Sequence, residues 1–304
     1  MKTYDIIIVG AGPGGLTAGI YAGRQGTKTL ILDKGLAGGI GREVPEMENY
    51  PGFDMISGLE LVEKIKEQCI KYVELHETEK VEDIIKSTDK FMVKTNKETY
   101  YGKTVILATG SSHKHLGIPG EEEYLGKGVS YCATCDGLFF KDKDVIIVGG
   151  GNSALQEALF LENIGCKVTI IHRRNQLRGQ QYLQKNIKEK NIKIIYNTIV
   201  EKIKGKTFVE SVILKNIETN NCIELKTSGV FISIGYIPHN KLAKKLNVKL
   251  NENGEIITDK HQKTNVKNVY SAGDICGGLR QWIVACGEGA IAATSAYIDI
   301  QQSD

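Results

Sequence analysis

Two glycine-rich turns, each set between a short apolar strand and a helix, constrain the fold of this chain more than any other feature. The first turn, Gly10-Ala-Gly-Pro-Gly-Gly15, follows the β-branched run Asp5-Ile-Ile-Ile-Val9. The second turn, Gly149-Gly-Gly-Asn-Ser-Ala154, follows Val145-Ile-Ile-Val148. Short apolar runs bounded by such turns are typical of buried parallel strands. The chain is therefore expected to contain two βαβ units.

The spacing within each turn is the one that dinucleotide-binding folds use. The first position makes the tight turn, the second lets the backbone approach a pyrophosphate, and the third allows close packing of helix and strand. The phosphates then face the N-terminus of the helix. These positions are Gly10, Gly12 and Gly15 in the first turn and Gly149, Gly151 and Ala154 in the second. Both turns have the strand–turn–helix context that the pattern requires.

The two halves repeat one plan beyond the turns. A second strand is expected at Lys28–Asp33 in the first half and at Lys167–His172 in the second. Stretches of short alternating strands follow at about 78–110 and 200–235, and each closes on a glycine. We interpret the chain as an α/β protein with two Rossmann-like three-layer nucleotide-binding domains, each with a β-meander.

The order of the segments predicts that one domain is inserted in the other. The C-terminal segment holds a strand, Val269-Tyr-Ser-Ala-Gly-Asp274, and a small-residue helix from about 287 to 298. Because this segment is too short for a domain, it is expected to complete the first one. The predicted domains are residues 1–115 with 242–304, and the inserted residues 116–241.

The residue that ends the second strand differs between the two units, and it predicts which nucleotide each unit binds. Asp33 lies 23 residues after Gly10, and His172 lies 23 residues after Gly149. A carboxylate there suits a ribose diol, which favours FAD or NAD in the first unit. The second unit instead offers a cationic cluster that suits a 2′-phosphate. The cluster is His172, Arg173, Arg174 and Arg178. The second unit is therefore expected to bind NADPH.

The C-terminal segment favours FAD in the first unit. Ala272-Gly-Asp274 places a carboxylate beside a glycine turn after a strand, where it suits the sugar or ribitol hydroxyls of a cofactor. The predicted layout is thus an FAD-binding domain at 1–115 and 242–304 and an NADPH-binding domain at 116–241.

A Cys-Ala-Thr-Cys-Asp run from Cys132 to Asp136 opens the second domain. One thiol of such a pair lowers the pKa of the other, attacks a disulfide, and leaves its neighbour to resolve the mixed disulfide. Asp136 is a candidate proton donor or acceptor for a leaving thiolate. A zinc site needs further ligands, whereas the other five cysteines are isolated and the six histidines are dispersed. We therefore predict a redox pair and no metal, and expect the isolated cysteines to be buried or half-buried.

Composition narrows the class of partner. The net charge of +3 is small and the basic residues are spread along the chain, which argues against nucleic acid. We expect no signal peptide at the N-terminus and no apolar run close to the ~20 residues of a membrane span. Seven cysteines with one close pair indicate a reducing compartment. A cytoplasmic location is expected.

Together, these motifs resemble the low-molecular-weight thioredoxin reductases over essentially the whole chain. Further matching pieces are Glu48-Asn-Tyr-Pro-Gly52, Ala108-Thr-Gly110 and Arg280-Gln281. The resemblance implies a homodimeric flavoprotein that passes electrons from NADPH, through FAD and the cysteine pair, to thioredoxin. It also implies alternation between two domain orientations, which would hinge at the two domain crossings.

By matching position, the resemblance implies that Cys135 faces the flavin, Cys132 attacks thioredoxin, and Asp136 is the acid. The implied FAD-binding residues are Gly10, Gly12, Pro13, Gly15, Asp33, Lys34, Gly39, Asn49, Ala108, Thr109, Gly110, Asp274, Arg280 and Gln281. The implied NADPH-binding residues are Gly149, Gly151, Asn152, Ser153, Ala154, His172, Arg173, Arg174 and Arg178.

The chain departs from the family pattern at Gly38-Gly39-Ile40, where a glutamine usually takes the place of the isoleucine. The change removes an amide expected near the flavin. Three alternatives stay open at this point. They are a ferredoxin-dependent reductase, an FAD-dependent dithiol oxidase, and a non-catalytic redox-sensing module. The second turn and its arginines favour NADPH over the first two, and the intact cysteine pair argues against the third.

Overall fold

The computed structural model of the chain describes residues 2–44 and 47–302. The chain divides into two compact units. Unit 1 comprises Met1–Ser112 and Ile237–Asp304, and unit 2 comprises His113–Tyr236. The sequence put these divisions at 115–116 and 241–242. The assignment of FAD to one unit and NADPH to the other stays a prediction.

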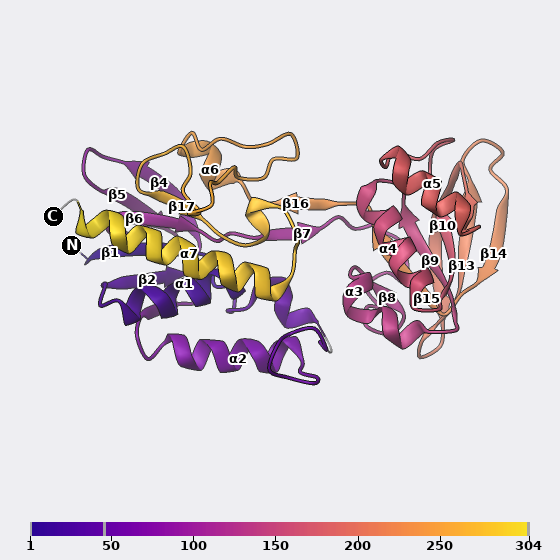
Figure 1. Cartoon of the computed structure of the whole chain (residues 1–304), viewed down its shortest axis with the longest axis horizontal. Coiled ribbons are helices and arrows are strands. Elements are labelled where there is room, and N and C mark those ends of the chain that lie inside the picture. Colours follow the sequence, from indigo (N-terminus) through magenta and orange to yellow (C-terminus); the bar gives the residue numbers. More distant parts are fainter. Residues whose placement is uncertain (1, 45–46, 303–304) are drawn as a thin grey trace. The chain divides into compact units, whose positions relative to one another are not determined.

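Unit 1 is built on five parallel strands in the order β3-β2-β1-β6-β17 (Figure 1). Their bounds are β1 Lys2–Val9, β2 Thr29–Leu32, β3 Glu74–His76, β6 Thr99–Leu107 and β17 Val269–Ser271. The β-meander continues the same sheet, because the first half of β6 also pairs with β5, Phe91–Thr95, which pairs with β4, Val81–Lys86. The C-terminal segment thus supplies a strand of this sheet.

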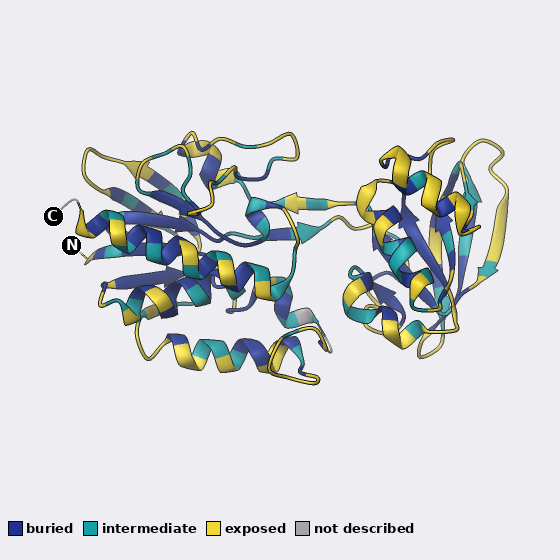
Figure 2. Ribbon diagram, in the orientation of Figure 1, coloured by how far each residue is buried: buried dark blue, intermediate teal, exposed yellow. Residues whose placement is uncertain are grey.

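Helices and short 3-10 turns flank the unit 1 sheet. The helices are α1 Pro13–Arg24, α2 Gly58–Cys69, α6 Lys241–Lys245 and α7 Trp282–Gln301, and the 3-10 turns are η1 Gly39–Glu43 and η3 Asp274–Cys276. Strand alternation separates two cores: Ile6 and Ile8 of β1 belong to one, and Ile7 and Val9 to the other. Figure 2 shows the buried strands between the helices of this unit.

Helix α7 packs closely against α1 (Figure 1). A Cβ added at Gly289 would lie 2.1 Å from the carbonyl oxygen of Gly14, so the glycine permits the contact. The helix spans Trp282–Gln301 and is longer than the predicted 287–298. By length and composition it could cross a membrane, which corrects the expectation that no apolar run approaches that length. That is weak support for a span, because Ala292, Ala293 and Ala296 are buried in the core of unit 1.

Unit 2 repeats the five-stranded parallel sheet in the order β11-β10-β9-β15-β8. Its strands are β8 Val129–Ser130, β9 Asp144–Gly149, β10 Lys167–Ile171, β11 Lys193–Ile195 and β15 Gly229–Ser233. Its helices are α3 Ala133–Asp136, α4 Asn152–Asn163 and α5 Gln181–Glu189, with a 3-10 turn η2 at Gly137–Phe140. The prediction of an α/β protein with two Rossmann-like domains is confirmed.

The meander of unit 2 differs from that of unit 1. It forms a separate three-stranded antiparallel sheet of β12 Thr198–Gly205, β13 Val209–Asn216 and β14 Cys222–Lys226. Strand β15 is distinct from β14, whereas the single long strand β6 takes part in both pairings of unit 1. The two segments that join the units, β7 Ser111–His113 and β16 Tyr236–Pro238, pair with each other.

Candidate active site

The cysteine pair lies in unit 2, and the structure has it oxidised. Cys132 and Cys135 form a disulfide whose Cα atoms are 5.3 Å apart. Cys132 is the N-cap residue of α3, and its carbonyl oxygen accepts hydrogen bonds from the N–H groups of Cys135 and Asp136. Both cysteines and Asp136 are half-buried. This short turn of helix therefore presents the two sulfurs and the acid together.

The first glycine-rich turn has the form of a phosphate cradle. No described side chain caps α1, whose N-cap residue is Gly12, and a Cβ at Gly12 would meet open space. Gly10 has φ +107, and a Cβ there would lie 2.1 Å from the carbonyl oxygen of Ala108. Pro13 occupies the start of the helix, where its missing N–H costs nothing. The free N–H groups of the first turn of α1 thus fit a pyrophosphate.

Asp33 lies at the end of β2 beside this turn. Its Oδ2 accepts a hydrogen bond from the N–H of Ala11 at 2.6 Å, and its Oδ1 accepts one from Gly35 at 2.8 Å. The carboxylate is therefore held in place beside the first glycine-rich turn. Lys34 and Gly39 are exposed, and Ile40 is half-buried in η1, where it offers no hydrogen-bonding side chain.

Predicted FAD residues that are far apart in the sequence meet in unit 1. The Asn49 amide donates to Gln281 Oε1 at 3.1 Å. The Thr109 hydroxyl donates to the carbonyl oxygen of His239 at 2.9 Å, and the N–H of His239 donates to the Gly110 carbonyl oxygen. His239 was not predicted, and its contacts show that it supports the Ala108–Gly110 loop.

Asp274 stands in a buried, charged environment. Burial raises the pKa of its carboxyl, although the Arg280 guanidinium and the Ser111 hydroxyl oppose the shift. Arg280 is ion-paired with Glu255. The turn before Asp274 is held by Glu288, whose Oε2 accepts a hydrogen bond from the Gly273 N–H at 2.7 Å. A polar cluster therefore surrounds the C-terminal end of β17.

Glu288 and Glu255 were not among the site residues predicted from the sequence. Burial, together with the nearby Asp274, raises the pKa of Glu288. A signal was present, because Glu288 and Asp299 are the only charged residues of the apolar helix α7. A lone acid in such a helix usually has a partner. Glu255 lies in a loop before β17 and has no comparable pattern.

The second glycine-rich turn has the same cradle. Gly151 is the N-cap of α4, no described side chain caps that helix, and a Cβ at Gly151 would meet open space. The Asn152 side chain accepts a hydrogen bond from the N–H of Gln180 at 2.7 Å. The N–H of Arg178 donates to the carbonyl oxygen of Gly150 at 2.7 Å. These bonds attach the loop that carries Arg178 to the turn itself.

His172 differs in its setting from the arginines beside it. It is buried, with Nδ1 3.1 Å from the Gly149 carbonyl oxygen and Nε2 3.0 Å from that of Gln176. Burial lowers the pKa of the imidazole. A Cβ at Gly150 would lie 2.3 Å from the ring, so His172 packs beneath the turn. The exposed cations at this edge are Arg173, Arg174 and Arg178.

The other cysteines are separate from the pair. Cys69, Cys166 and Cys286 are buried and Cys276 is half-buried, but Cys222 is exposed, contrary to expectation. Burial raises the pKa of Cys69 and of Cys276 to about 12, which keeps both thiols protonated. The described residues contain no group of three potential metal ligands.

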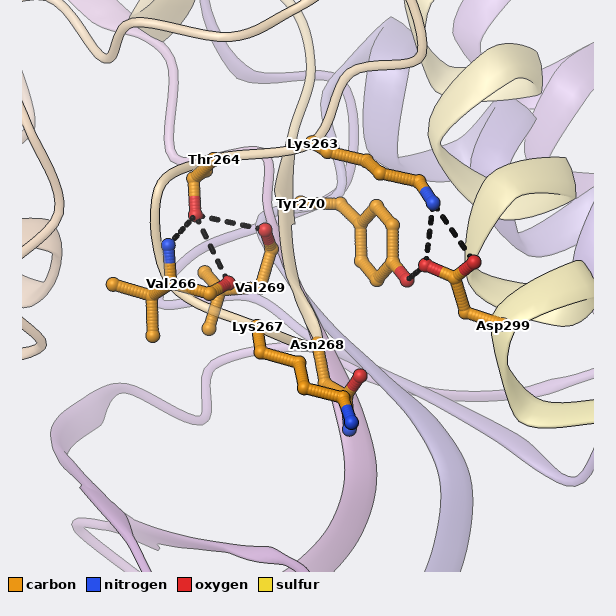
Figure 3. A pocket seen from close by; sticks show the side chains of 8 residues that line it. All are labelled: Lys263, Thr264, Val266, Lys267, Asn268, Val269, Tyr270 and Asp299. Carbon is orange, nitrogen blue, oxygen red and sulfur yellow. Dashed lines mark hydrogen bonds and ion pairs between the residues drawn. The ribbon is translucent and has the colours of Figure 1, made fainter. Parts of the chain in front are cut away.

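A cavity of about 200 Å³ lies in unit 1, and none of the predicted site residues lines it (Figure 3). Asp299 accepts hydrogen bonds there from Tyr270 at 2.6 Å and from Lys263 at 2.8 Å. Burial opposes ionisation, but these bonds outweigh it and hold the pKa of Asp299 below its ordinary value. Lys263, Tyr270 and Asp299 are thus paired with one another in this cavity.

Comparison with known proteins agrees with this geometry. Residues 4–289 match the pyridine nucleotide-disulphide oxidoreductase family. The thioredoxin reductase of Treponema pallidum is 41% identical, over 99% of this chain and 99% of that protein. The thioredoxin reductase of Bacillus subtilis is also 41% identical, over 99% and 96%. The crystal structure of thioredoxin reductase from Streptococcus pyogenes, 40% identical, superimposes with a TM-score of 0.93 over 99% of both chains.

The chain belongs to the pyridine nucleotide-disulphide oxidoreductase family. Within that family it is a flavoprotein disulfide reductase whose cofactors are FAD and NADPH.

Proposed function

We propose that this protein uses NADPH to reduce the disulfide of a thioredoxin, through FAD in unit 1 and the Cys132–Cys135 pair in unit 2. The main support for this proposal is the disulfide at the start of α3. It lies next to Asp136 and in the same unit as the second glycine-rich turn. The thioredoxin reductases that resemble the chain over nearly their whole length support this substrate.

The chain's own residues carry the exchange with the substrate. In the reduced protein, the Cys132 thiolate attacks one sulfur of the substrate disulfide. A mixed disulfide forms, and the released substrate thiolate takes a proton from Asp136. The Asp136 carboxylate then takes the proton of Cys135, and the resulting Cys135 thiolate attacks the Cys132 sulfur. The second substrate thiolate leaves and receives that proton from Asp136, and the disulfide of the structure is restored. Two electrons leave the cysteine pair and two thiols form on the substrate.

Two groups of residues hold the cofactors. In unit 1, the first turn of α1 binds the pyrophosphate of FAD, and Asp33 holds its ribose. Asn49, Gln281 and Asp274 would hold the rest of the FAD molecule. When bound, FAD supplies the two-electron relay between NADPH and the disulfide. In unit 2, the turn before α4 binds the NADPH pyrophosphate.

The 2′-phosphate of NADPH is the charge that the arginines recognise. Arg173, Arg174 and Arg178 are exposed at the end of β10 and in the loop attached to the turn. Guanidinium groups bind phosphate through charge-assisted, often bidentate hydrogen bonds. His172 acts beneath the turn and holds its shape. A ferredoxin-dependent reductase or a dithiol oxidase would not need this cluster, and the comparisons do not favour either.

We further infer that the enzyme is a cytoplasmic homodimer that binds neither nucleic acid nor membrane. The modest net charge and the single close cysteine pair support this inference. The homodimer is what the resemblance to the thioredoxin reductases implies.

A stopped-flow experiment tests the donor. The oxidised holoenzyme is mixed with equal concentrations of NADPH, NADH or reduced ferredoxin, and flavin absorbance is followed. We expect bleaching with NADPH at a rate at least about 100 times that with NADH, which is the effect of losing about 3 kcal/mol of phosphate contacts. Equal rates with the two nucleotides would contradict the NADPH assignment. Bleaching by ferredoxin alone would favour the alternative reductase.

A further inference from the structure

The residue before Cys132 contacts the place where the chain enters unit 2, and that place contacts the one where the chain leaves it. The ring of Tyr131 stacks on His113, with ring centres 4.5 Å apart and planes inclined by 19°. His113 in turn lies 5.0 Å from the ring of Tyr236. His113 and Tyr236 are the first and last residues of unit 2, and both belong to the paired joining strands β7 and β16.

The hydroxyl of Tyr131 is tied to a buried carboxylate. It donates to Glu121 Oε1 at 2.6 Å. Glu121 is 2% exposed and also accepts the N–H groups of Leu116 at 3.0 Å and Gly117 at 2.7 Å. Burial opposes its charge, but these hydrogen bonds outweigh burial and keep the pKa of Glu121 below its ordinary value. The carboxylate is therefore a charged acceptor, which makes the bond to Tyr131 a strong one.

A second donor completes the arrangement. Nδ1 of His115 lies 2.8 Å from the Tyr131 hydroxyl oxygen. Because the Tyr131 hydroxyl donates its hydrogen bond to Glu121, the Nδ1–H of His115 donates to the Tyr131 hydroxyl oxygen. Tyr131 is thus fixed at its ring by His113 and at its hydroxyl by Glu121 and His115.

The backbone connects the anchored Tyr131 directly to Cys132. The Cys132 N–H donates to the Ser130 hydroxyl at 3.0 Å, and that hydroxyl donates back to the Cys132 carbonyl oxygen at 3.3 Å. Cys132 is bonded directly to Tyr131 and begins α3. The position of its sulfur therefore depends on where Tyr131 is held.

We propose that Tyr131 is a positioning residue, which holds Cys132 in place relative to the joining strands through Glu121 and His113. The proposal rests on the proposed role of Cys132 in attacking a protein disulfide. Such an attack needs a defined approach of the thiolate to the sulfur–sulfur bond, and displacements of about 1 Å can cost about 100-fold in rate.

The test compares Tyr131→Phe with Tyr124→Phe in the holoenzyme. Tyr131→Phe removes the bonds to Glu121 and His115 and keeps the ring. Tyr124 is the control, because it belongs to the hydrophobic cluster of unit 2 against which Tyr131 packs, and its hydroxyl donates to the Gly205 carbonyl oxygen at 2.8 Å. We expect Tyr131→Phe to lower kcat/KM for thioredoxin about tenfold, with flavin bleaching by NADPH unchanged. Tyr124→Phe should change neither.

A second readout does not depend on thioredoxin. In a Cys135→Ser, Cys222→Ser background, which also removes the exposed thiol of Cys222, the free Cys132 thiol is alkylated with iodoacetamide. We expect Tyr131→Phe to speed alkylation, because the half-buried sulfur becomes more accessible. Glu121→Gln should act in the same direction, and the double variant should add little, since both changes break one hydrogen bond. Unchanged alkylation and unchanged kcat/KM in Tyr131→Phe would overturn the proposal.

The two readouts separate this inference from the proposed function. If the unmodified enzyme failed to reduce thioredoxin, the proposed function would fail. The alkylation rates would still decide whether Tyr131 positions Cys132.

Discussion

Glu157 shows how a single residue can weaken a fold for reasons that only packing reveals. It lies on α4, and its Oε1 accepts a hydrogen bond from the Ser233 hydroxyl at 3.1 Å. Its Oε2 is buried and has no partner among the described residues. Burial raises the pKa of the carboxyl to about 7, against the effect of Ser233. Nothing in the sequence around Gln156-Glu157 distinguishes this acid from an exposed one.

The raised pKa predicts that Glu157 destabilises the protein as the pH rises. The folded state keeps its proton up to about pH 7, whereas the unfolded chain releases it near pH 4.5. Stability is therefore lost between these values and the loss is complete above pH 7, at about 3 kcal/mol. Glu157→Gln should raise the free energy of unfolding, measured by urea denaturation, more at pH 8 than at pH 5.5. The difference between the two increases should be about 2 kcal/mol. Glu189→Gln, on the exposed face of α5, is the control and should show no such difference.

At the scale of elements, the contact between α1 and α7 connects the C-terminal segment to the first nucleotide turn. Gly289 faces the Gly14 carbonyl oxygen, so the two helices meet without an intervening side chain. The sequence indicated a small-residue helix but not its partner. Periodicity identifies a helix and its small residues, whereas the facing helix lies more than 200 residues away in the chain. That the meander of unit 2 forms a sheet of its own was not predicted for the same reason, because the local sequence pattern does not specify which strands pair.

Gly289→Ala should disturb this contact. The added methyl would have to displace the Gly14 carbonyl oxygen, and overpacking of this kind costs about 1–3 kcal/mol. Since Gly14 lies in the first turn of α1, where we propose that the pyrophosphate of FAD binds, purified protein should also contain less FAD. Gly287→Ala on the same helix is the control, because a Cβ there meets nothing within 4 Å. Equal stability and flavin content in the two variants would show that the helices do not depend on this glycine.

At the scale of the molecule, the two parts of the proposed electron path belong to different units. The first glycine-rich turn lies in unit 1, and Cys132, Cys135 and the second turn lie in unit 2. Electrons must therefore pass from one unit to the other during a catalytic cycle. The chain passes between the two units twice, at the paired joining strands β7 and β16.

Cys135→Ser should separate the steps of this path. The change removes the resolving thiol but leaves both nucleotide turns intact. Reduction of thioredoxin by NADPH, measured with a reagent that detects thiols, should fall to the background level, while NADPH still bleaches the flavin in stopped flow. Turnover of thioredoxin by this variant would refute the role of the cysteine pair.

By itself, the sequence determined the fold class, the repeat of two nucleotide-binding halves and the family resemblance. These depend on local signals, namely strand–glycine–helix turns, the acid or basic residues 23 positions later, and the Cys132–Asp136 run. The individual site roles stay predictions. Tertiary structure alone decided which polar groups meet, including Glu288 with the Gly273 N–H and Tyr131 with Glu121. Such pairs depend on burial and on contacts between distant segments, and no spacing in the chain encodes them.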